Sequence, residues 1–577
     1  MNVSDIEQRF EISGVLTQRK TLRYFVSLLL INFSTLSLMS VDGLVVGNFI
    51  GPDALASVSI FYPVMLLVSL PSVLLANGAA VVLSKKIGDI GEINQHGLNK
   101  TKDAIVKLIV MFALFTSLIQ YTLVKFVVAS YNLSSEMSGL VMNYAWGIMI
   151  SMPFGLISIV GMLILQDFGK MNSLIVLSST EGAVNILLDL FFVGFLKMGV
   201  AGAGYGTALA NIVRASLTVL YIARRTDFFS FHGEKSSIED MREIISSGIP
   251  ECAKIFISTF QEYFIIAIIL KIFPEDGGAI LGICWFAFCL AMVFAKSIID
   301  AVRPLTGLLI GAEAWKPLQL VMKQGLRMLI LITGLVTLLM EFFPQIIFTW
   351  YGVFKIPEGG IMSLRIFCLH FLFNGISSLL RMYITANDEY KFATVITLAG
   401  YVTLPAFAYG LSLILPAPWV WLSYLITEFI VLIPAFLKYR QIESTSLTEK
   451  DQSSKKIYMS VSPDKAVETS RAIRSFAEEN GCSKRLAYRV SLCMEEMTAY
   501  AVKSQGSREI HIQIFISFYE DRAIFVMLDD GECITFDKEE EVQELITDHY
   551  ALIKKIAKSM NYRYLMNMNY TRLVFSK

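Results

Sequence analysis

Twelve long apolar runs constrain this chain more than any other feature of its sequence. Each run has roughly 20 residues or more, the length that an α-helix needs to cross the hydrocarbon core of a bilayer. The 577 residues are 55% hydrophobic and only 17% charged, whereas soluble domains contain about 25% charged residues. Most of the chain is therefore expected to face lipid or other membrane helices.

The twelve runs predict twelve transmembrane helices in two sets of six. The first set covers approximately 22–48, 54–80, 102–129, 138–162, 170–195 and 200–223, and the second covers 247–272, 279–308, 324–349, 361–384, 391–415 and 417–437. A polar segment, Thr226–Arg242, separates the two sets. Two halves of similar length are typical of transporters with an internal repeat. We therefore expect one lobe over residues 1–225 and a second over 226–440.

Lys and Arg residues mark the helix ends that would face the cytoplasm. Lys86 follows the second run and Arg225 follows the sixth, while connections on the other side, such as Gly51–Asp53, contain few basic residues. Because cytoplasmic loops carry an excess of Lys and Arg, this bias predicts that both termini are cytoplasmic. Met1–Lys20 is polar and leads directly into the first run, so no cleavable signal peptide is expected.

The composition changes after Lys438, where a polar linker at 441–456 leads into a segment with the charge content of a soluble domain. Within residues 457–577, helical and alternating apolar patterns predict two helices and at least three strands. These elements are expected at Pro463–Gly481, Ser483–Lys503, Glu509–Tyr519, Arg522–Leu528 and near Tyr570–Ser576. The fold class is therefore an all-α polytopic membrane protein with a small cytoplasmic α/β sandwich.

Two carboxylates inside the apolar runs are the main candidates for a functional site in the membrane. Asn185 and Asp189 share one helical face because they are four residues apart, and Asp42 lies in the first run. With a rise of about 1.5 Å per residue, Asp42, Asp189 and Thr207 all lie roughly 10–15 Å below the outer surface. A carboxylate at that depth is costly unless it is paired or has a function.

The shared depth predicts one site made of Asp42, Asn185, Asp189 and Thr207. Two carboxylates in a poorly hydrated site cannot both ionise at low cost, so a proton or a Na⁺ ion is expected between them. Asn185 and Thr207 add neutral oxygens, which hard cations prefer. No other metal site is expected. The alternative is that the four side chains form separate hydrogen bonds between helices.

Over about residues 15–440 the chain resembles the multidrug and toxic compound extrusion (MATE) transporters. The matching motifs are VDGLVVGNFIGPDALASVSIFYP (41–63), NILLDLFF (185–192), GVAGAGYGTALAN (199–211) and GIP (248–250). The resemblance implies two six-helix lobes around a central cavity, with a Na⁺ or H⁺ gradient driving export of amphipathic, often cationic compounds. It also implies a cation site at Asp42, Asn185, Asp189 and Thr207.

The second half resembles the family less closely. Some members carry a glutamate on the seventh helix and an aspartate on the tenth. Here the seventh helix has Glu251 near its cytoplasmic end and Glu262 further in, and the tenth has His370 and Asn374 but no aspartate. We therefore expect coupling in the first lobe. Glu262 is a secondary candidate, and His370 is expected to be a packing residue.

Two motifs of the tail, LAYRVSLCMEEMTAYAV (486–502) and VMLDDGECITFD (526–537), resemble the ATP-binding domains of anti-sigma-factor kinases and histidine kinases. The resemblance implies nucleotide contacts from Glu496, Asp529 and Gly531. Tyr500 replaces the Mg²⁺-binding asparagine of that fold, and DHYALIKKIAK (548–558) replaces its glycine-rich phosphate lid. We expect a fold kept for protein contact or nucleotide sensing, with binding of ATP and Mg²⁺ left open.

These features predict a cation-coupled antiporter of a bacterial plasma membrane, and not an enzyme. Its partners would be a small-molecule substrate, the lipid bilayer and a cytoplasmic protein that the tail binds. H⁺ or Na⁺ would be the coupling ion, and no cofactor is expected. The net charge of zero gives no indication of nucleic-acid binding, and the seven cysteines follow no metal or disulfide spacing.

Two other functions also fit the sequence. A flippase for lipid-linked sugars or polysaccharides would need a phosphate-binding cavity, for which the embedded basic residues are Arg303, Arg365 and Arg381. A membrane receptor could signal through the tail, although no phosphoacceptor-histidine helix precedes the ATPase-like segment. No motif encodes the substrate, the choice of coupling ion or the oligomeric state.

Overall fold

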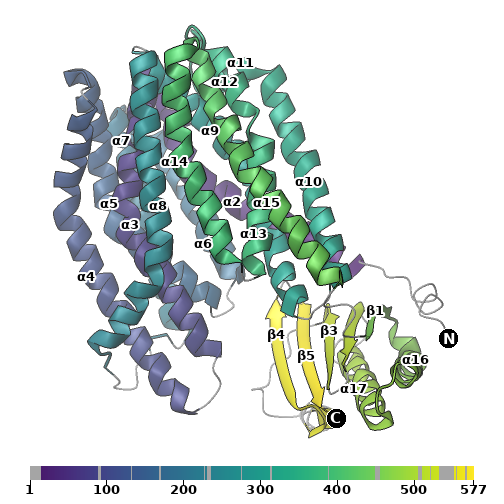
Figure 1. Ribbon diagram of the computed structural model, residues 1–577. Coiled ribbons are helices and arrows are strands. Elements are labelled where there is room, and N and C mark those ends of the chain that lie inside the picture. The colour runs from purple at the N-terminus through teal and green to yellow at the C-terminus, as the bar shows by residue number, and fades with distance from the viewer. Residues whose placement is uncertain are drawn as a thin grey trace.

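The computed structural model describes residues 15–88, 92–131, 133–167, 171–226, 228–229, 235–274, 276–311, 315–387, 389–448, 455–503, 510–519, 522–531, 552–553, 555–565 and 568–576. Long helices form a bundle, and a sheet with two helices lies beyond one end of that bundle (Figure 1). We refer to the other end, remote from the sheet, as the distal end.

The helices of the bundle follow the expected runs closely. The first half contains α2 (Val15–Phe49), α3 (Pro52–Gly88), α4 (Glu92–Ser130), α5 (Ser135–Asp167), α6 (Met171–Asp189), the π-helix η1 (Leu190–Phe195) and α7 (Val200–Arg225). The second half contains α8 (Ile238–Ile272), α9 (Gly277–Gly311), α10 (Trp315–Phe342), α11 (Pro344–Trp350), α12 (Gly360–Cys368), α13 (Phe371–Ala386), α14 (Tyr390–Ile414), the 3₁₀-helix η2 (Ala417–Trp421) and α15 (Leu422–Thr448).

Ten helices of the described chain are long and apolar enough to cross a membrane. The bent segments Asn99–Thr116 and Ile119–Ser130 of α4 form an eleventh candidate if they are counted together. The first expected span coincides with α2, which does not belong to that set of candidates. The polytopic helical fold is therefore confirmed, while the number of twelve membrane crossings stays a prediction.

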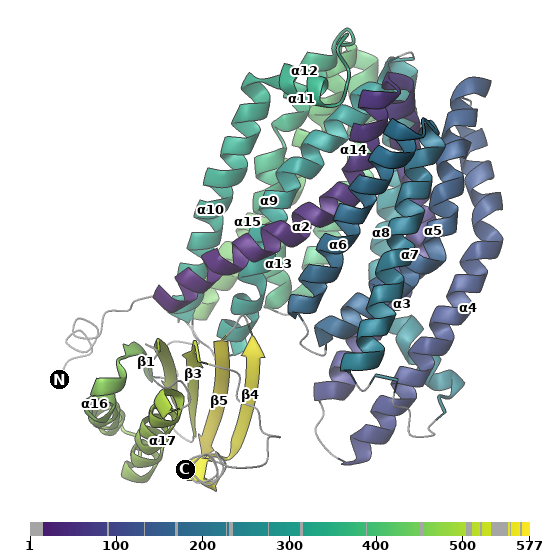
Figure 2. The same ribbon diagram turned by 180° about the vertical axis from the view of Figure 1, so that it is seen from behind.

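The helix α2 runs obliquely across the bundle and joins its two halves (Figure 2). It packs against α6 of the first half and against α9 of the second. Asn32 of α2 donates a hydrogen bond of 3.0 Å to Ser297 of α9. Near the distal end, the Asn48 amide donates a hydrogen bond of 2.5 Å to the Trp350 carbonyl oxygen. The first helix is thus bonded to the second half at two separate levels.

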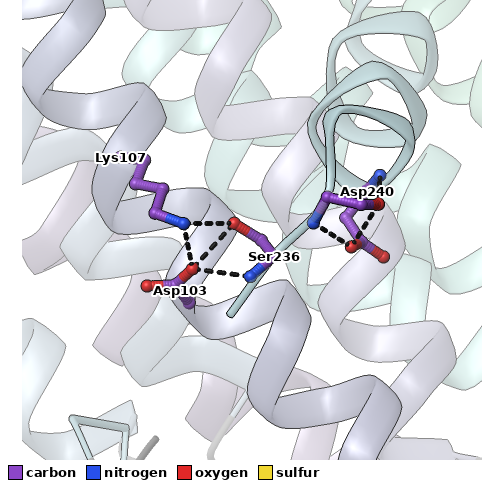
Figure 3. A network of polar contacts seen from close by, with 5 residues as sticks. Asp103, Lys107, Ser236 and Asp240 are labelled. Atoms are coloured by element: carbon purple, nitrogen blue, oxygen red, sulfur yellow. Dashed lines mark hydrogen bonds and ion pairs between the residues drawn. The ribbon is translucent and has the colours of Figure 1, made fainter. Parts of the chain in front are cut away.

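The polar connection between the halves is anchored to α4 (Figure 3). Both the backbone N–H and the hydroxyl of Ser236 donate to Asp103 Oδ2, at 2.8 and 2.7 Å. Lys107 Nζ donates to Ser236 Oγ at 3.0 Å and lies 2.6 Å from the Asp103 carboxylate. Ser237 then forms a capping box with Asp240 at the start of α8. The start of α8 is therefore held against the first half.

The tail folds into an antiparallel five-stranded sheet with the order β1-β2-β3-β5-β4. Its elements are β1 (Lys455–Val461), the 3₁₀-turn η3 (Pro463–Lys465), α16 (Ala466–Glu479), α17 (Lys484–Lys503), β2 (Ile512–Phe518), β3 (Arg522–Asp529), β4 (Ser559–Leu565) and β5 (Met568–Ser576). The expected α/β domain is present, with β1 and β4 in addition to the predicted strands. Since α15 extends to Thr448 and β1 begins at Lys455, regular structure reaches into both ends of the expected linker.

Both faces of this sheet are apolar. One face forms a core with α16 and α17 that includes Ile514, Phe525 and Leu573. On the other face, Phe515 and Val526 belong to the same contiguous apolar cluster as residues of α9, α13 and α15 in the bundle. This continuity connects the tail with helices of the second half.

The closest helix crossing of the first half generates a prediction about stability. A Cβ atom at Gly204 of α7 would lie 2.6 Å from the Tyr144 carbonyl oxygen of α5, closer than real Cβ contacts. Gly204→Ala should therefore lower the free energy of unfolding by about 1–3 kcal/mol, because the added methyl group pushes α5 and α7 apart. Thermal unfolding in detergent measures this effect. Gly139→Ala of α5 is the control, since its Cβ would meet nothing within 4 Å. Equal melting temperatures of the two variants would contradict the close crossing.

Candidate functional site

The four residues of the predicted membrane site lie together where α2, α6 and α7 meet. The Thr207 hydroxyl donates a hydrogen bond of 2.9 Å to Asp42 Oδ2. The Asn185 amide donates one of 3.3 Å to the Thr207 hydroxyl oxygen. Asp42, Asn185 and Asp189 are at most 1% exposed. The arrangement is thus a single buried cluster and not a set of separate helix-to-helix hydrogen bonds.

Two further residues belong to this cluster that the sequence analysis did not identify. Tyr144 of α5 donates its hydroxyl proton to Asp42 Oδ2 at 2.7 Å. Asn211, one turn after Thr207 on α7, donates to the Thr207 carbonyl oxygen at 3.1 Å. A tyrosine inside an apolar run carries no sequence signal of its own, and only the crossing of α5 with α7 brings Tyr144 to Asp42.

Four oxygen atoms of the cluster have no hydrogen-bond partner within the described chain. They are Asp42 Oδ1, Asn185 Oδ1 and both carboxyl oxygens of Asp189. The carboxyl groups of Asp42 and Asp189 are close enough to interact electrostatically, and neither forms an ion pair with a described Lys, Arg or His side chain. Buried polar atoms normally have partners, so this group of acceptors fits a bound proton or a small cation.

Local backbone features hold Asp189 in this position. Asp189 ends α6, and the π-helical turn Leu190–Phe195 follows it directly. Such π-helical segments are frequently found at functional sites. On α7, a Cβ atom at Gly206 would collide with Asp189 Oδ1. The carboxyl group therefore lies against α7 only because position 206 has no side chain.

A buried ion pair extends this polar region along α6 and α7. Glu181 pairs with Arg214, and their side chains are 1% and 11% exposed. Arg214 also donates to Asn211 Oδ1 at 3.2 Å, which links the pair to Thr207. The sequence carried a usable signal here, since a glutamate and an arginine inside apolar runs are expected to pair.

A polar cavity separate from the Asp42 cluster lies between helices of the second half and α3 of the first, whose Tyr62 and Leu66 also line it. It has a volume of about 380 Å³, and Glu262 and His370 line it. His370 Nδ1 lies 2.5 Å from the Phe367 carbonyl oxygen, and its ring stacks on Phe288 with centroids 5.5 Å apart. His370 is thus a packed residue, as predicted. The Glu251 side chain lies outside the described residues.

The candidate nucleotide residues of the tail lie on α17 and at the end of β3. Asp529 is 3% exposed, and its Oδ1 accepts hydrogen bonds from the Gly531 N–H at 3.0 Å and from the Asn569 amide at 2.7 Å. Burial and the nearby Asp529 carboxylate raise the pKa of Tyr500, which keeps the Tyr500 hydroxyl neutral. Glu496 is half-buried on α17.

Much of the segment that replaces the phosphate lid, 548–558, lies outside the described residues. In the described part, local side-chain and backbone donors already bind the Asp529 oxygen that would recognise a base. A neutral tyrosine cannot replace an asparagine oxygen on Mg²⁺ with comparable strength. The described geometry therefore adds no support for binding of a metal–nucleotide complex.

Comparison with known proteins decides the family of the chain. A family model described as MatE matches residues 27–191 and 251–409, which is more than half of the chain. The chain belongs to the MATE family of transporters. MATE proteins are multi-pass membrane transporters, not enzymes, and in general they are cation-coupled antiporters.

Several known proteins and solved structures are similar to this MATE chain. It is 23% identical over 336 residues to "Probable multidrug resistance protein NorM" of Listeria monocytogenes, covering 56% of this chain and 73% of that protein. It is 22% identical over 332 residues to "Probable multidrug resistance protein YoeA" of Bacillus subtilis, covering 56% and 71%. A solved inward-facing multidrug resistance MATE transporter has a TM-score of 0.65 at 20% identity, over 74% of this chain and 99% of that one. This structural likeness concerns the fold alone.

The Glu181–Arg214 pair generates a prediction for the first lobe. Arg214→Met should lower the free energy of unfolding by about 3–5 kcal/mol, because it leaves a buried glutamate without its partner. The double variant Glu181→Gln/Arg214→Met should recover most of this loss, as measured by thermal unfolding in detergent. Arg474→Met, which breaks an exposed pair with Glu478, is the control and should cost about 0–1 kcal/mol. Equal effects of Arg214→Met and Arg474→Met would contradict the buried pair.

Proposed function

We propose that this MATE transporter exports amphipathic, positively charged small molecules across a bacterial plasma membrane in exchange for H⁺ or Na⁺. The observation that carries the proposal is the group of four buried oxygen atoms of Asp42, Asn185 and Asp189 that have no partner. Two neighbouring carboxylates in a low dielectric repel each other strongly unless a positive charge lies between them. Asp42, Asn185, Asp189 and Thr207 are therefore assigned as the coupling site.

Contacts at the distal end connect this site to the second half, so that a change at the site can alter access to the transport pathway. A Cβ atom at Gly43, the residue after Asp42, would lie 3.3 Å from the Tyr351 ring, and one at Gly47 would collide with the Tyr351 carbonyl oxygen. Tyr351 belongs to the second half and packs on Phe286 with ring centroids 4.3 Å apart. The part of α2 that carries Asp42 therefore also contacts the second half at the distal end, through Gly43 and Gly47.

These contacts support a rocking mechanism. Binding of the coupling cation removes the repulsion between the Asp42 and Asp189 carboxylates and lets α2 approach α6 and α7. A shift of α2 changes the close contact of Gly43 and Gly47 with Tyr351, which opens or closes the distal end. One movement of α2 relative to the second half would then link two events. The cation enters from one side of the membrane, and the substrate is released on that same side.

Export of a cationic compound is favoured over flipping of a phosphate-bearing lipid. The cavity between α3 and the second half is lined by the two carboxyl groups of Glu262 and Glu428 and by one guanidinium group, that of Arg381. A cavity that binds phosphate would need the opposite balance of charge. The similarity to proteins named as multidrug resistance proteins also supports export of small molecules.

The tail is proposed to regulate transport through contact with the second half or with a cytoplasmic protein. The apolar continuity between the sheet and the ends of α9, α13 and α15 supports this role. The neutral Tyr500 and the occupied Asp529 oxygen argue against ATP hydrolysis as the energy source.

The coupling site predicts the behaviour of an Asp42 variant. Asp42→Asn should abolish dye export driven by a pH or Na⁺ gradient, because it removes one of the two charges that hold the coupling cation. Proteoliposomes that contain a fluorescent cationic dye, with each gradient imposed separately, provide the measurement. Asp53→Asn is the matched control, since Asp53 is exposed at the start of α3, and it should export normally. Full export by a folded Asp42→Asn protein would contradict the site assignment.

The tail predicts a different outcome for truncation. Removal of the residues after Thr448, where α15 ends, should leave gradient-driven export in place but change its rate by about twofold or more. The reason is that the coupling residues all lie in the first half, while the apolar cluster that includes the sheet consists mainly of residues from helices of the second half. The same proteoliposome assay measures both rates. An unchanged rate in a well-folded truncated protein would contradict the regulatory role.

A further inference from the structure

A column of buried polar side chains continues from the Asp42 cluster through the first half, between α5, α6 and α7. On α6, Glu181, Asn185 and Asp189 follow one another at intervals of four residues and therefore lie on one face of the helix. Glu181 is 1% exposed. The coupling mechanism uses Asn185 and Asp189 but gives no role to Glu181.

The helix α7 presents a matching polar row to this face of α6. The members of the row are spaced by four, three and four residues, which places them on one side of the helix; they are Thr207, Asn211, Arg214 and Thr218. Arg214, the partner of Glu181, donates to Asn211 Oδ1 at 3.2 Å, and the Asn211 amide donates to the Thr207 carbonyl oxygen at 3.1 Å. The row is therefore bonded to the coupling site.

The row on α7 leads away from the coupling site. The helix runs from the distal end towards the end of the bundle next to the sheet, which we call the sheet-side end (Figure 2). Thr218 lies 11 residues after Thr207, which corresponds to about 16 Å along the helix axis. The polar column thus extends from the coupling site through much of the depth of the first half.

The helix α5 covers the third side of the column with small residues. A Cβ atom at Gly155 would lie 3.6 Å from Asn211 Oδ1. One at Gly161 would lie 2.5 Å from Thr218 Cγ2. Ser158 is three residues from each glycine and is fully buried, so it lies on the same face of α5, at a level between Asn211 and Thr218.

Four polar atoms of this column have no hydrogen-bond partner in the part of the chain that the structure describes. They are Ser158 Oγ, Glu181 Oε1, Arg214 Nε and Thr218 Oγ1. Hydroxyl groups in the middle of a helix often bond a carbonyl oxygen of the preceding turn, as Ser151 of α5 does with Ile148 at 2.7 Å. Buried polar atoms without a protein partner are normally satisfied by water. These four atoms therefore fit a chain of water molecules that continues from the coupling site.

Apolar side chains end the column before the sheet-side end. Ile222, one turn after Thr218 on α7, is 2% exposed and belongs to an apolar cluster that includes Ile164 and Leu177. Arg225, in the last turn of α7, is exposed. The buried polar column is thus separated from the sheet-side surface by an apolar barrier at the level of Ile222.

We propose that this column is the route by which the coupling cation, H⁺ or Na⁺, moves between the Asp42 cluster and the sheet-side end. Glu181 Oε1 and the hydroxyl groups of Ser158 and Thr218 supply oxygen contacts along the route. Arg214 does not exclude a cation, because it is paired with Glu181, and this pair keeps α6 and α7 at a fixed separation. The inference rests on the proposed antiport function and deepens it, since it gives the ion a path separate from the cavity between the halves.

Replacement of the two free hydroxyl groups distinguishes a route from a structural role. Ser158→Ala/Thr218→Val removes buried hydroxyls that have no partner, so thermal stability in detergent should stay the same or rise. Gradient-driven dye export in proteoliposomes should nevertheless slow about fivefold or more, because oxygen contacts along the route are lost. Thr180→Val removes a hydroxyl that bonds the Val176 carbonyl oxygen on α6; it is the control and should export at the wild-type rate. Export at the wild-type rate by Ser158→Ala/Thr218→Val would overturn the proposal.

Opening of the apolar barrier provides a second readout, in which a function is gained. Ile222→Ser extends the polar column towards the sheet-side end, so proteoliposomes without dye should take up Na⁺ or H⁺ about fivefold faster than with wild-type protein. Radioactive Na⁺ and a pH-sensitive dye inside the vesicles measure the two ions separately. Leu108→Ser places the same polar group in the same apolar cluster, on α4, and should cause no leak.

The leak should pass through the column. Glu181→Gln/Arg214→Met, added to Ile222→Ser, should return ion uptake to the wild-type rate, because the methionine interrupts the row of polar groups and the acceptor carboxylate is lost. Equal uptake by Ile222→Ser and wild type, equal leaks from Ile222→Ser and Leu108→Ser, or a leak that persists in the triple variant would each overturn the proposal.

The two readouts distinguish failure of this route from failure of the export function. No gradient-driven dye export by the wild-type protein, together with a leak from Ile222→Ser that Glu181→Gln/Arg214→Met removes, would contradict the proposed function and leave the route intact. Normal dye export by wild type and by Ser158→Ala/Thr218→Val, with no leak from Ile222→Ser, would contradict the route and leave the proposed function intact.

Discussion

The cost of holding carboxyl groups in a medium of low polarity underlies the organisation of this protein. Asp42, Asp189, Glu181, Glu262 and Glu428 all lie in helices of the bundle, where an isolated charge is strongly disfavoured. Four of these five groups are accommodated in three different ways. Glu181 has an arginine partner, Glu428 has two neutral donors, and the pair of Asp42 and Asp189 has fewer donors than acceptors.

This difference divides the bundle into structural and functional polar groups. A paired charge such as Glu181 contributes a fixed contact between α6 and α7. In the proposed mechanism, a positive charge between the carboxylates of Asp42 and Asp189 stabilises the pair, so the energy of the pair depends on ion concentration. Because α2 carries Asp42 and at the same time bonds to α9 and to the distal end of the second half, the proposed mechanism lets cation binding between Asp42 and Asp189 change the contact between the lobes.

The sequence was sufficient to predict the helices and four members of the first-lobe cluster, Asp42, Asn185, Asp189 and Thr207. Long apolar runs and matching depths in the membrane can both be counted directly along the chain. It was not sufficient for contacts that depend on how helices cross. Tyr144 reaches Asp42 only because the small residues Gly147 and Gly204 let α5 and α7 approach closely. Glu428 was overlooked for a similar reason, since its partners Asn374 and Ser377 lie on another helix. The strand β1 was missed because it begins at Lys455, within the polar segment predicted as a linker, and β4 was missed because it is rich in polar residues.

A direct count of bound coupling ions would test the central claim that Asp42 and Asp189 share one cation. Purified protein in detergent would be titrated with radioactive Na⁺, and in parallel the protons released as pH is raised would be counted, for wild type and for Asp42→Asn/Asp189→Asn. The account predicts that wild type holds one cation per chain, Na⁺ or H⁺, that the double variant lacks, while Glu262→Gln retains it. Equal numbers of bound Na⁺ and released H⁺ in wild type and the double variant would contradict the account.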